Sequence, residues 1–383
     1  MIDFNLSESF ESMGTSMQVE IFSSIDHIKE SDWNQLIHPD DIFNNYHFHR
    51  ALEAANCIGE ERGQIPFYIT ISEHQELKSA CVIYLKSHSY GEYIFDWSWA
   101  NLYERYGYNY YPKLIAQNPF TPATNRTLLY SDKKHIPYLF EEICKISNLH
   151  NCTSKHLLFL EEDELELIPN DYKKRTSFQY HWKNYNYKNF EEFLFKLKSK
   201  KAKQIRRERL TDLEIREIKP ELLKEYATIF YKLYASTIVK KQSYAYLNLD
   251  FFIYIFTNMS DSTRLIGAFD QENLVAASLF FIGRDKLYGR YWGAVEEYKN
   301  LHFELCYYQG IELCIRNNIA VFEAGAQGEH KIARGFEPTK THSAHQIHDH
   351  NFQDPIYNFI DEEDKQIKDL FPELKRKLPF KKI

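Results

Sequence analysis

Leu287-Tyr-Gly-Arg-Tyr-Trp-Gly293 is the stretch that bears most directly on the fold of this chain. Two glycines stand among bulky aromatic residues and one arginine, in a segment that predicts a β-strand. Glycine inside a strand is typical of a β-bulge, or of a place where a ligand approaches the backbone closely. A twisted strand at the edge of a sheet is the alternative. The stretch therefore predicts either a bulged strand that carries a site or a plain sheet edge.

The residues that follow this strand favour the first interpretation. Apolar residues at helical spacing predict a helix over 302–317, and a short strand follows at 319–323. That strand leads into Phe322-Glu-Ala-Gly-Ala-Gln-Gly-Glu-His-Lys-Ile-Ala-Arg-Gly-Phe-Glu-Pro338. A glycine-rich turn with an acid, an imidazole and two cations presents backbone N–H groups and side chains at one place. The alternative is a tight turn with solvated charges.

Several longer strings extend the pattern over most of the chain. They are His88-Ser-Tyr-Gly-Glu-Tyr-Ile-Phe-Asp-Trp-Ser-Trp99, Tyr111-Pro-Lys-Leu114, Pro119-Phe-Thr-Pro122, Gln204-Ile-Arg-Arg-Glu-Arg209, Tyr288-Gly-Arg-Tyr-Trp-Gly293, Leu301-His-Phe-Glu304 and Gly325-Ala-Gln-Gly-Glu-His-Lys331. Together they resemble the FemAB-like predicted N-acyltransferases, also described as peptidoglycan biosynthesis/recognition proteins, from about residue 40 to about residue 350. The resemblance implies an α/β protein of tandem GNAT-like domains, with mixed central sheets flanked by helices.

The alternation of strand and helix signals gives the domain limits. We expect a loose tail at 1–17, an N-terminal GNAT-like domain at 18–185, a C-terminal GNAT-like domain at 186–350 with a basic helix at 189–210, and an extension at 351–383.

The same resemblance implies an N-acyltransferase that moves an acyl or aminoacyl group onto an amine. The acceptor would be a small molecule or a cell-wall precursor, of a peptidoglycan or sugar-phosphate type, held in a groove between the domains. The donor would be acyl-CoA or aminoacyl-tRNA, and tRNA is then a possible partner. The glycine-containing pyrophosphate loop of GNAT enzymes is missing from Val295-Glu-Glu-Tyr-Lys-Asn-Leu301, which weakens the case for acyl-CoA. The alternative is a noncatalytic GNAT-like protein that binds a cell-wall precursor or another phosphate-bearing ligand.

Acyl transfer to an amine needs a base, donors for the oxyanion and a proton for the leaving group. We expect His330 to be the base, oriented by Glu329 or Glu304. Backbone N–H groups near Gly289 or Gly293 would hold the oxyanion, and Tyr291 or Tyr308 would return a proton. A helix cap is the plainer role for Glu329 and His330.

Further residues of the two halves are expected to line the substrate. In the second half these are Arg290, Trp292, Gln327 and Lys331. In the first half they are Asp96, Trp97 and Tyr103, because aromatic rings with one acid suit a sugar or an amine. An aromatic core between the domains would explain the first-half residues equally well.

The basic segment predicts a phosphate site. Lys200, Lys203, Arg206 and Arg207 lie within the expected helix 189–210, where like charges repel unless an anion sits among them. A solvated charged helix is the alternative.

Bulk composition narrows the class of protein. A net charge of −7 argues against a protein that coats nucleic acid. The six cysteines have no metal or disulfide spacing, which suits a cytoplasmic protein. The chain has no signal-peptide pattern and no apolar run long enough for a transmembrane segment. His342, His345, His348 and His350 lack companion carboxylates, so we expect no metal. Oligomeric state does not follow from the sequence.

Overall fold

The computed structural model describes residues 6–12, 15–94, 96–240, 244–326 and 328–381. It divides into two compact units. Unit 1 comprises Met1–Ser177 and Lys340–Ile367, and unit 2 comprises Phe178–Thr339 and Lys368–Ile383. The chain therefore passes between the units three times, whereas the sequence predicted consecutive domains at 18–185 and 186–350 and an extension at 351–383.

The sheet of unit 1 has the strand order β1-β2-β3-β4-β5-β7-β14, with β6 beside β4. The bounds are β1 Leu6–Ser12, β2 Thr15–Phe22, β3 Gln64–Glu73, β4 Glu76–Lys86, β5 Lys113–Ala116, β6 Leu128–Tyr130, β7 Ser154–Leu160 and β14 Glu337–Ile347. Among the described strands of this unit, neighbours are antiparallel except β5 and β7, which run parallel.

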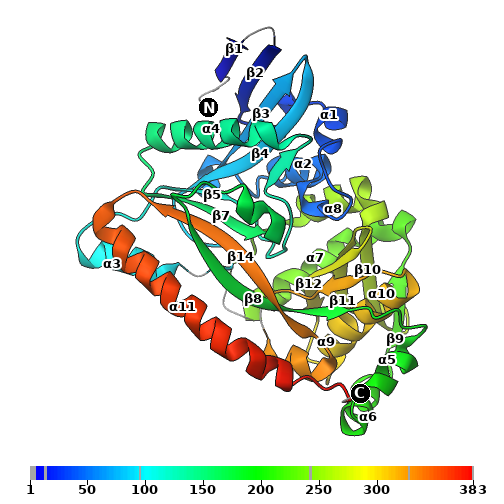
Figure 1. Ribbon diagram of the computed structural model, residues 1–383. Coiled ribbons are helices and arrows are strands. Elements are labelled where there is room, and N and C mark those ends of the chain that lie inside the picture. The colour runs from blue at the N-terminus through cyan, green and yellow to red at the C-terminus, as the bar shows by residue number, and fades with distance from the viewer. Residues whose placement is uncertain (1–5, 13–14, 95, 241–243, 327, 382–383) are drawn as a thin grey trace. The chain divides into compact units, whose positions relative to one another are not determined.

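Helices cover both faces of this sheet because the side chains of each strand alternate. The helices are α1 Glu30–Asn34, α2 Tyr46–Ala54, α3 Trp97–Arg105 and α4 Ile136–Leu149. On β3, Phe67 and Ile69 join the apolar cluster that α4 closes, and Figure 1 shows α4 lying across the strands. Tyr68, between them, faces the other way and contacts Trp33 of α1 and His49 of α2.

The sheet of unit 2 has the order β8-β13-β12-β11-β10-β9. The bounds are β8 Lys173–Lys183, β9 Glu214–Ile218, β10 Thr263–Asp270, β11 Asn273–Ile282, β12 Lys286–Ala294 and β13 Val321–Glu323. Here β12 and β13 form the parallel pair, and the other described neighbours of this unit are antiparallel.

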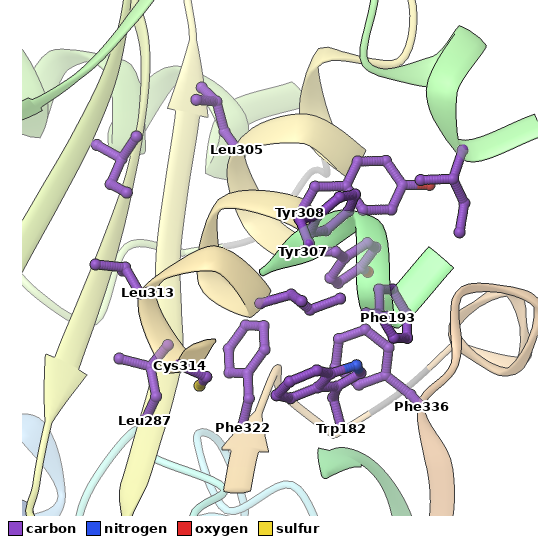
Figure 2. Close-up of a cluster of buried hydrophobic side chains, with 14 of the residues drawn as sticks. Trp182, Phe193, Leu287, Leu305, Tyr307, Tyr308, Leu313, Cys314, Phe322 and Phe336 are labelled. Carbon is purple, nitrogen blue, oxygen red and sulfur yellow. The ribbon is translucent and has the colours of Figure 1, made fainter. Parts of the chain in front are cut away.

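Helices of unit 2 cover this sheet in the same manner. They are α5 Phe190–Lys196, α6 Ser199–Glu208, α7 Leu223–Lys240, α8 Leu249–Asn258, α9 Leu301–Phe303 and α10 Gln309–Arg316. Figure 2 shows the main core, in which Leu305 and Leu313 of the helical segment 301–316 pack near Leu287 and Phe322 of the sheet. Trp182, Phe193 and Phe336 close the core from the other side of Phe322.

The predicted helix at 302–317 forms, but it contains one turn of π-helix. Glu304–Tyr308 is π-helical, between α9 and α10. A π-turn inside an α-helix is rare and often lies at a functional site. Gly310 follows this turn, and a side chain there would overlap the ring of Phe322.

The predicted single basic helix at 189–210 is wrong, because the chain breaks at Leu197. This residue is extended and fully buried, and it forms a β-bridge with Phe380. The next residue, Lys198, donates its backbone N–H to the carbonyl of Pro379 at 2.8 Å. A strand-like contact with the C-terminal segment therefore interrupts the helix and separates α5 from α6.

The two ends of the chain are more ordered than expected. Residues predicted as a loose tail at 1–17 include strand β1 and the start of β2, which pair with each other. The expected extension contains helix α11, His350–Arg376. Phe352, Ile356 and Ile360 of α11, spaced four apart, join a cluster in unit 1, and Leu374 joins the core of unit 2.

Candidate functional site

Strand β12 carries the bulge that its glycines predicted. Leu279 of β11 lies opposite Tyr291, and the next residue, Phe280, lies opposite Gly289. Arg290 is therefore the extra residue of the strand. A bulge of this kind re-aims a side chain and is common next to active sites.

The strands β12 and β13 part directly beside this bulge. Their pairing covers only Lys286–Tyr288 against Val321–Glu323. Beyond it β12 continues through Arg290, whereas β13 ends and the chain turns at Gly325, whose φ is 85°. Parallel strands that diverge leave room between them for side chains.

Charged side chains meet where the two strands part. The side chain of Arg290 is 2% exposed, and its Nη2 lies 3.9 Å from Glu323 Oε2. His181 Nε2, from β8, lies 4.0 Å from the same oxygen. Lys331 is 1% exposed and donates from Nζ to the carbonyl of Gly325 at 2.7 Å. The glycine-rich turn is thus the segment that brings Lys331 into the interior.

Burial sets the protonation states in this group. Desolvation, with a further contribution from Arg290, lowers the pKa of Lys331 to about 7. Desolvation likewise lowers the pKa of His181 to about 3, so its ring is neutral near pH 7. Lys331 is therefore an amine that can take up and release a proton at neutral pH, as a general base must.

His330, expected as the base, is exposed and has a different partner from the one predicted. Its Nε2 lies 2.9 Å from the hydroxyl of Tyr307. Burial lowers the pKa of His330, and Arg334 and Lys331 lower it further. Glu329 is exposed in the 3-10 helix Glu329–Arg334. Tyr307 belongs to the predicted helix at 302–317, and its position in the sequence gave no sign of this contact.

Glu304, the other expected partner of His330, is part of an ion-pair network. Arg209 donates from Nε and Nη2 to both carboxylate oxygens of Glu304, each at 2.9 Å. Tyr308, the alternative proton donor, donates a hydrogen bond from its hydroxyl to the carboxylate of Glu208. The same carboxylate accepts hydrogen bonds from Arg334. These groups hold α6 against the π-turn.

The remaining expected residues of β12 have packing contacts. Tyr291 packs against the rings of Tyr234 and Phe252, at centroid distances of 5.6 and 5.9 Å. Trp292 lies 5.3 Å from the ring of His302. A side chain at Gly293 would overlap the backbone of Leu233 in α7, and one at Gly289 would lie 3.1 Å from the ring of Phe322. Both glycines thus permit close packing. Gln327 lies outside the described residues.

The basic residues of α6 that were expected to bind phosphate do not line one common site. All four expected phosphate ligands are exposed, namely Lys200, Lys203, Arg206 and Arg207. Arg206 pairs with Glu191 of α5 at 2.5 Å. Arg207 lines a surface cleft with Gln204, Glu208, Leu210, Lys299 and Asn300. The cleft therefore joins α6 to the loop that precedes α9, and it carries two cations and one carboxylate, Glu208, which is paired with Arg334.

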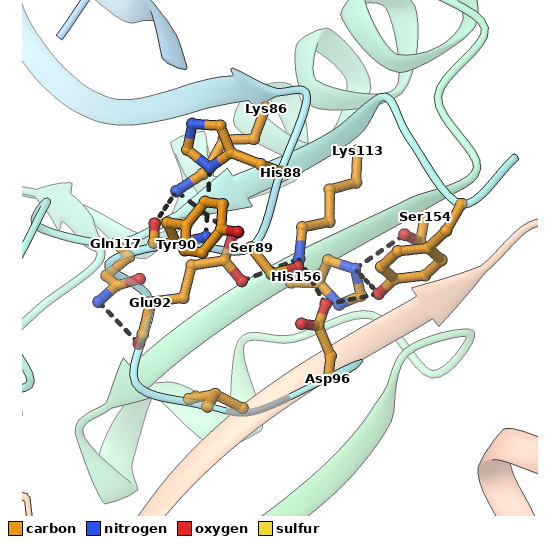
Figure 3. A network of polar contacts seen from close by, with 12 residues as sticks. Lys86, His88, Ser89, Tyr90, Glu92, Asp96, Lys113, Gln117, Ser154 and His156 are labelled. Atoms are coloured by element: carbon orange, nitrogen blue, oxygen red, sulfur yellow. Dashed lines mark hydrogen bonds and ion pairs between the residues drawn. The ribbon is translucent and has the colours of Figure 1, made fainter. Parts of the chain in front are cut away.

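The expected first-half residues separate into buried and exposed ones. Asp96 lies in a buried ionic network, which Figure 3 shows. Tyr103 is buried and stacks on Phe352 at 3.8 Å between ring centroids. Trp97 is 41% exposed and packs against Tyr90.

Lys113 is the centre of the network in unit 1. Its Nζ donates to Ser89 Oγ at 2.7 Å, to Glu92 Oε2 at 2.8 Å and to Asp96 Oδ2. Burial alone would raise the pKa of Asp96, but Lys113 outweighs it and the pKa is lowered. Burial would lower the pKa of Lys113, but Glu92 and Asp96 outweigh it and the pKa is raised. All of these residues lie within strings quoted above, yet the sequence did not indicate that they meet.

The comparison with known proteins places the chain in a family. The sequence matches the FemAB-like family, described as peptidoglycan biosynthesis/recognition, over residues 24–382. The chain belongs to the FemAB-like family. No curated protein matches it by sequence.

Solved structures were compared with this FemAB-like chain, and FemX shares its fold. FemX has a TM-score of 0.52 and 11% identity, covering 87% of this chain and 98% of FemX. A conserved protein of unknown function from Bacteroides thetaiotaomicron has a TM-score of 0.48 and 12% identity, covering 84% and 98%. A tandem GNAT protein from the clavulanic acid biosynthesis pathway has a TM-score of 0.43 and 9% identity, covering 86% and 98%. The predicted α/β fold, with mixed sheets flanked by helices, is confirmed.

Two further features of this FemAB-like chain concern metals and membranes. In the described ranges, no group of three or more His, Cys, Asp and Glu side chains is placed to hold a metal ion. Within those same ranges, every helix is too short or too polar to cross a bilayer.

Proposed function

We propose that this FemAB-like protein transfers an acyl or aminoacyl group to an amine, where β12 and β13 part in unit 2. The observation that carries the proposal is the buried Lys331, which has a pKa of about 7 and interacts electrostatically with Arg290 at the bulge. N-acyl transfer needs a base that works at neutral pH and a cation for the developing oxyanion. Lys331 and Arg290 would supply these two functions.

The chemistry assigns a role to each group. The lone pair of the acceptor amine attacks the acyl carbonyl carbon, forming the C–N bond, and the carbonyl oxygen becomes an oxyanion near Arg290. Neutral Lys331 takes the proton that the amine loses. The bond to the donor oxygen or sulfur then breaks, and a proton returns to that leaving atom. His330 and Tyr307, joined at 2.9 Å, would relay protons between this place and solvent.

The donor is acyl-CoA or aminoacyl-tRNA, and both carry phosphates. The cleft with Arg207 and Lys299 lies at the loop before α9, and its two cations suit a phosphate of either donor. The family's description favours a peptidoglycan-type acceptor. All six cysteines lie in the described part of the chain and none is disulfide-bonded, which accords with a reaction in the cytoplasm.

Mass spectrometry tests the proposal. Peptidoglycan-precursor amines are incubated with acyl-CoA species or with aminoacyl-tRNA, and the product should gain the mass of the transferred group. The rate should rise with pH and level off above about 7, because the neutral form of Lys331 is the active one.

A substitution at Lys331 tests whether this residue is the base. Lys331→Met should lower the rate by about 100-fold or more, whereas Lys183→Met, which removes an exposed lysine of β8, should leave it unchanged. Equal rates in both variants would show that Lys331 takes no part in the reaction. Binding of a precursor without any mass gain, from either donor, would favour the noncatalytic recognition protein.

A further inference from the structure

In unit 2 the C-terminal segment lies beside the turn that joins α5 to α6. Besides its bridge to Leu197, this segment donates the backbone N–H of Lys381 to the carbonyl of Lys196 at 2.9 Å. Lys198 donates from Nζ to the carbonyl of Leu378 at 3.3 Å. Figure 1 shows the last residues of the chain, in red, next to α5 and α6. Two segments that are far apart in the sequence therefore form one surface.

Both segments are basic and contain no acid. Residues 193–207 contain five lysines and two arginines, and residues 375–381 contain three lysines and one arginine. The bases nearest the contact are four exposed lysines, Lys196, Lys198, Lys377 and Lys381. In the described part of the chain none of these four pairs with a carboxylate, whereas Arg206 pairs with Glu191. Like charges that are held together repel, so a partner that brings negative charge is favoured at this surface.

An exposed phenylalanine lies among these lysines. Phe195 is 70% exposed. Lys381 donates from Nζ to the backbone carbonyl of Phe195 at 2.6 Å, and the same Nζ lies 4.2 Å from the centre of its ring. A single exposed apolar side chain is ordinary, but this ring is surrounded by cations from two segments. Phe195 and the four lysines are called the lysine patch below.

We propose that the lysine patch binds the surface of an anionic phospholipid membrane. The lysines lie among the phosphate headgroups, and the ring of Phe195 lies at the boundary between headgroups and acyl chains. Binding of this kind takes place at the surface and needs no helix that crosses the bilayer. The proposal does not depend on the transfer reaction, because it is tested by binding alone.

Two features of the lysine patch favour a lipid surface over RNA. The four bases nearest the contact are all lysines, which act as point charges, whereas arginine is preferred for nucleic acids because its planar group binds a phosphate with two hydrogen bonds. Lys381 lies over the ring of Phe195, so that face of the ring is not open for stacking on a base. A membrane interface needs only an apolar ring beside cations whose stems reach water.

Sedimentation of the full chain with lipid vesicles tests the proposal. The protein should sediment with phosphatidylcholine vesicles that contain phosphatidylglycerol, and not with vesicles of phosphatidylcholine alone. Phosphatidylserine should replace phosphatidylglycerol, because the lysine patch responds to charge and not to one headgroup. Binding should weaken as the salt concentration rises. Equal binding to anionic and neutral vesicles, or binding to neither, would overturn the proposal.

Two triple variants of equal net charge locate the binding surface. K196Q/K198Q/K381Q removes three exposed lysines of the lysine patch, and K219Q/K224Q/K232Q removes three exposed lysines elsewhere in unit 2. Each lysine at an anionic surface strengthens binding about fivefold, so the first variant should bind vesicles about 100-fold more weakly. The second should bind like the unchanged protein. Both should keep the Tm, because the substituted side chains are exposed. Equal losses of binding would show that net charge alone matters and would refute the lysine patch.

A change at Phe195 tests the contact of its ring with lipid. Phe195→Ser keeps every charge and alters only an exposed side chain, and it should weaken vesicle binding about tenfold, because the ring is no longer buried in the interface. An unchanged affinity would show that the ring stays outside the membrane, against the proposal. Transfer RNA is the competing ligand. If it binds the unchanged protein but not K196Q/K198Q/K381Q, and anionic vesicles do not bind at all, the patch is a nucleic-acid surface and the proposal is wrong.

Discussion

The Nδ1 atoms of His156 and His345 face each other at 2.8 Å across the neighbouring strands β7 and β14. Each ring also contacts a serine hydroxyl through Nε2 at 2.8 Å, at Ser154 and Ser343 respectively. Burial lowers the pKa of both histidines well below the usual value. Both rings are therefore neutral in the folded protein, and one Nδ1–H donates to the other nitrogen.

This pair should make stability fall in mild acid. In the unfolded chain a histidine has a pKa of about 6.5, so below that pH the unfolded state binds more protons than the folded state. Each buried neutral histidine should then cost about 1.4 kcal/mol of unfolding free energy per pH unit. In the double variant H156L/H345L, the change of unfolding free energy with pH should be smaller by about twice this amount per pH unit. Urea unfolding between pH 6.5 and 5 measures it. An unchanged slope would show that these two rings take up protons as readily in the folded protein as in the unfolded chain.

The Lys113 network should behave as a buried ion pair, unlike the ion pairs at the surface. Lys113→Met leaves Glu92 and Asp96 buried without their shared cation, and we expect a loss of about 3–5 kcal/mol. Lys134→Met removes an exposed lysine that pairs with Glu73, and we expect a far smaller loss because water screens this pair. Denaturant titration of both variants measures the difference. Similar losses in the two variants would mean that the network is hydrated in solution.

The two neighbouring arginines of α6 should differ in function. Arg207 lines the cleft with Lys299, whereas Arg206 pairs with Glu191. Arg207→Ala should raise the KM for the phosphate-bearing donor by about tenfold, because a charge-assisted contact contributes about 1.5 kcal/mol or more. Arg206→Ala is the matched control and should have little effect. An equal rise in KM for both would indicate diffuse attraction to the basic helix instead of a defined site.

Gly293 should tolerate a side chain far less well than Gly289. A methyl group at Gly293 would meet the backbone of α7, which cannot move aside, so Gly293→Ala should cost about 3 kcal/mol. At Gly289 the neighbour is the ring of Phe322, which can shift, and Gly289→Ala should cost about 1 kcal/mol or less. Thermal unfolding compares the two, and equal losses would contradict the packing assigned to α7.

Features of the fold that depend on residues close together in the sequence could be predicted from local patterns. The glycines of β12 predicted a bulge or a close approach to the backbone, and the structure shows a bulge at Arg290 and close packing at both glycines. The apolar spacing after residue 301 predicted a helix, but not its π-turn. The break at Leu197 could not be predicted, since its cause is the contact with Phe380, far along the chain.

The candidate site depends even more on burial and on contacts between residues that are distant in the sequence. The glycine-rich turn indicated which segment carries Lys331, but the preference for His330 followed from its ordinary pKa. Only the structure shows that Lys331 is buried and that its pKa has shifted into the range of a neutral-pH base. Asp96 was expected to face a substrate, whereas Lys113, seventeen positions away in the sequence, encloses it in the core.

The division of the chain into interleaved segments has a consequence for how the protein is made. Strand β14, which completes the sheet of unit 1 beside β7, is synthesised only after nearly all of unit 2 has left the ribosome. Unit 2 in turn needs Leu374 and Phe380, which are synthesised later still. Neither unit can finish folding before these late segments emerge, so an unpaired edge of β7 stays exposed during elongation. A chaperone that shields strand edges should therefore raise the yield of this protein more than its size alone would suggest.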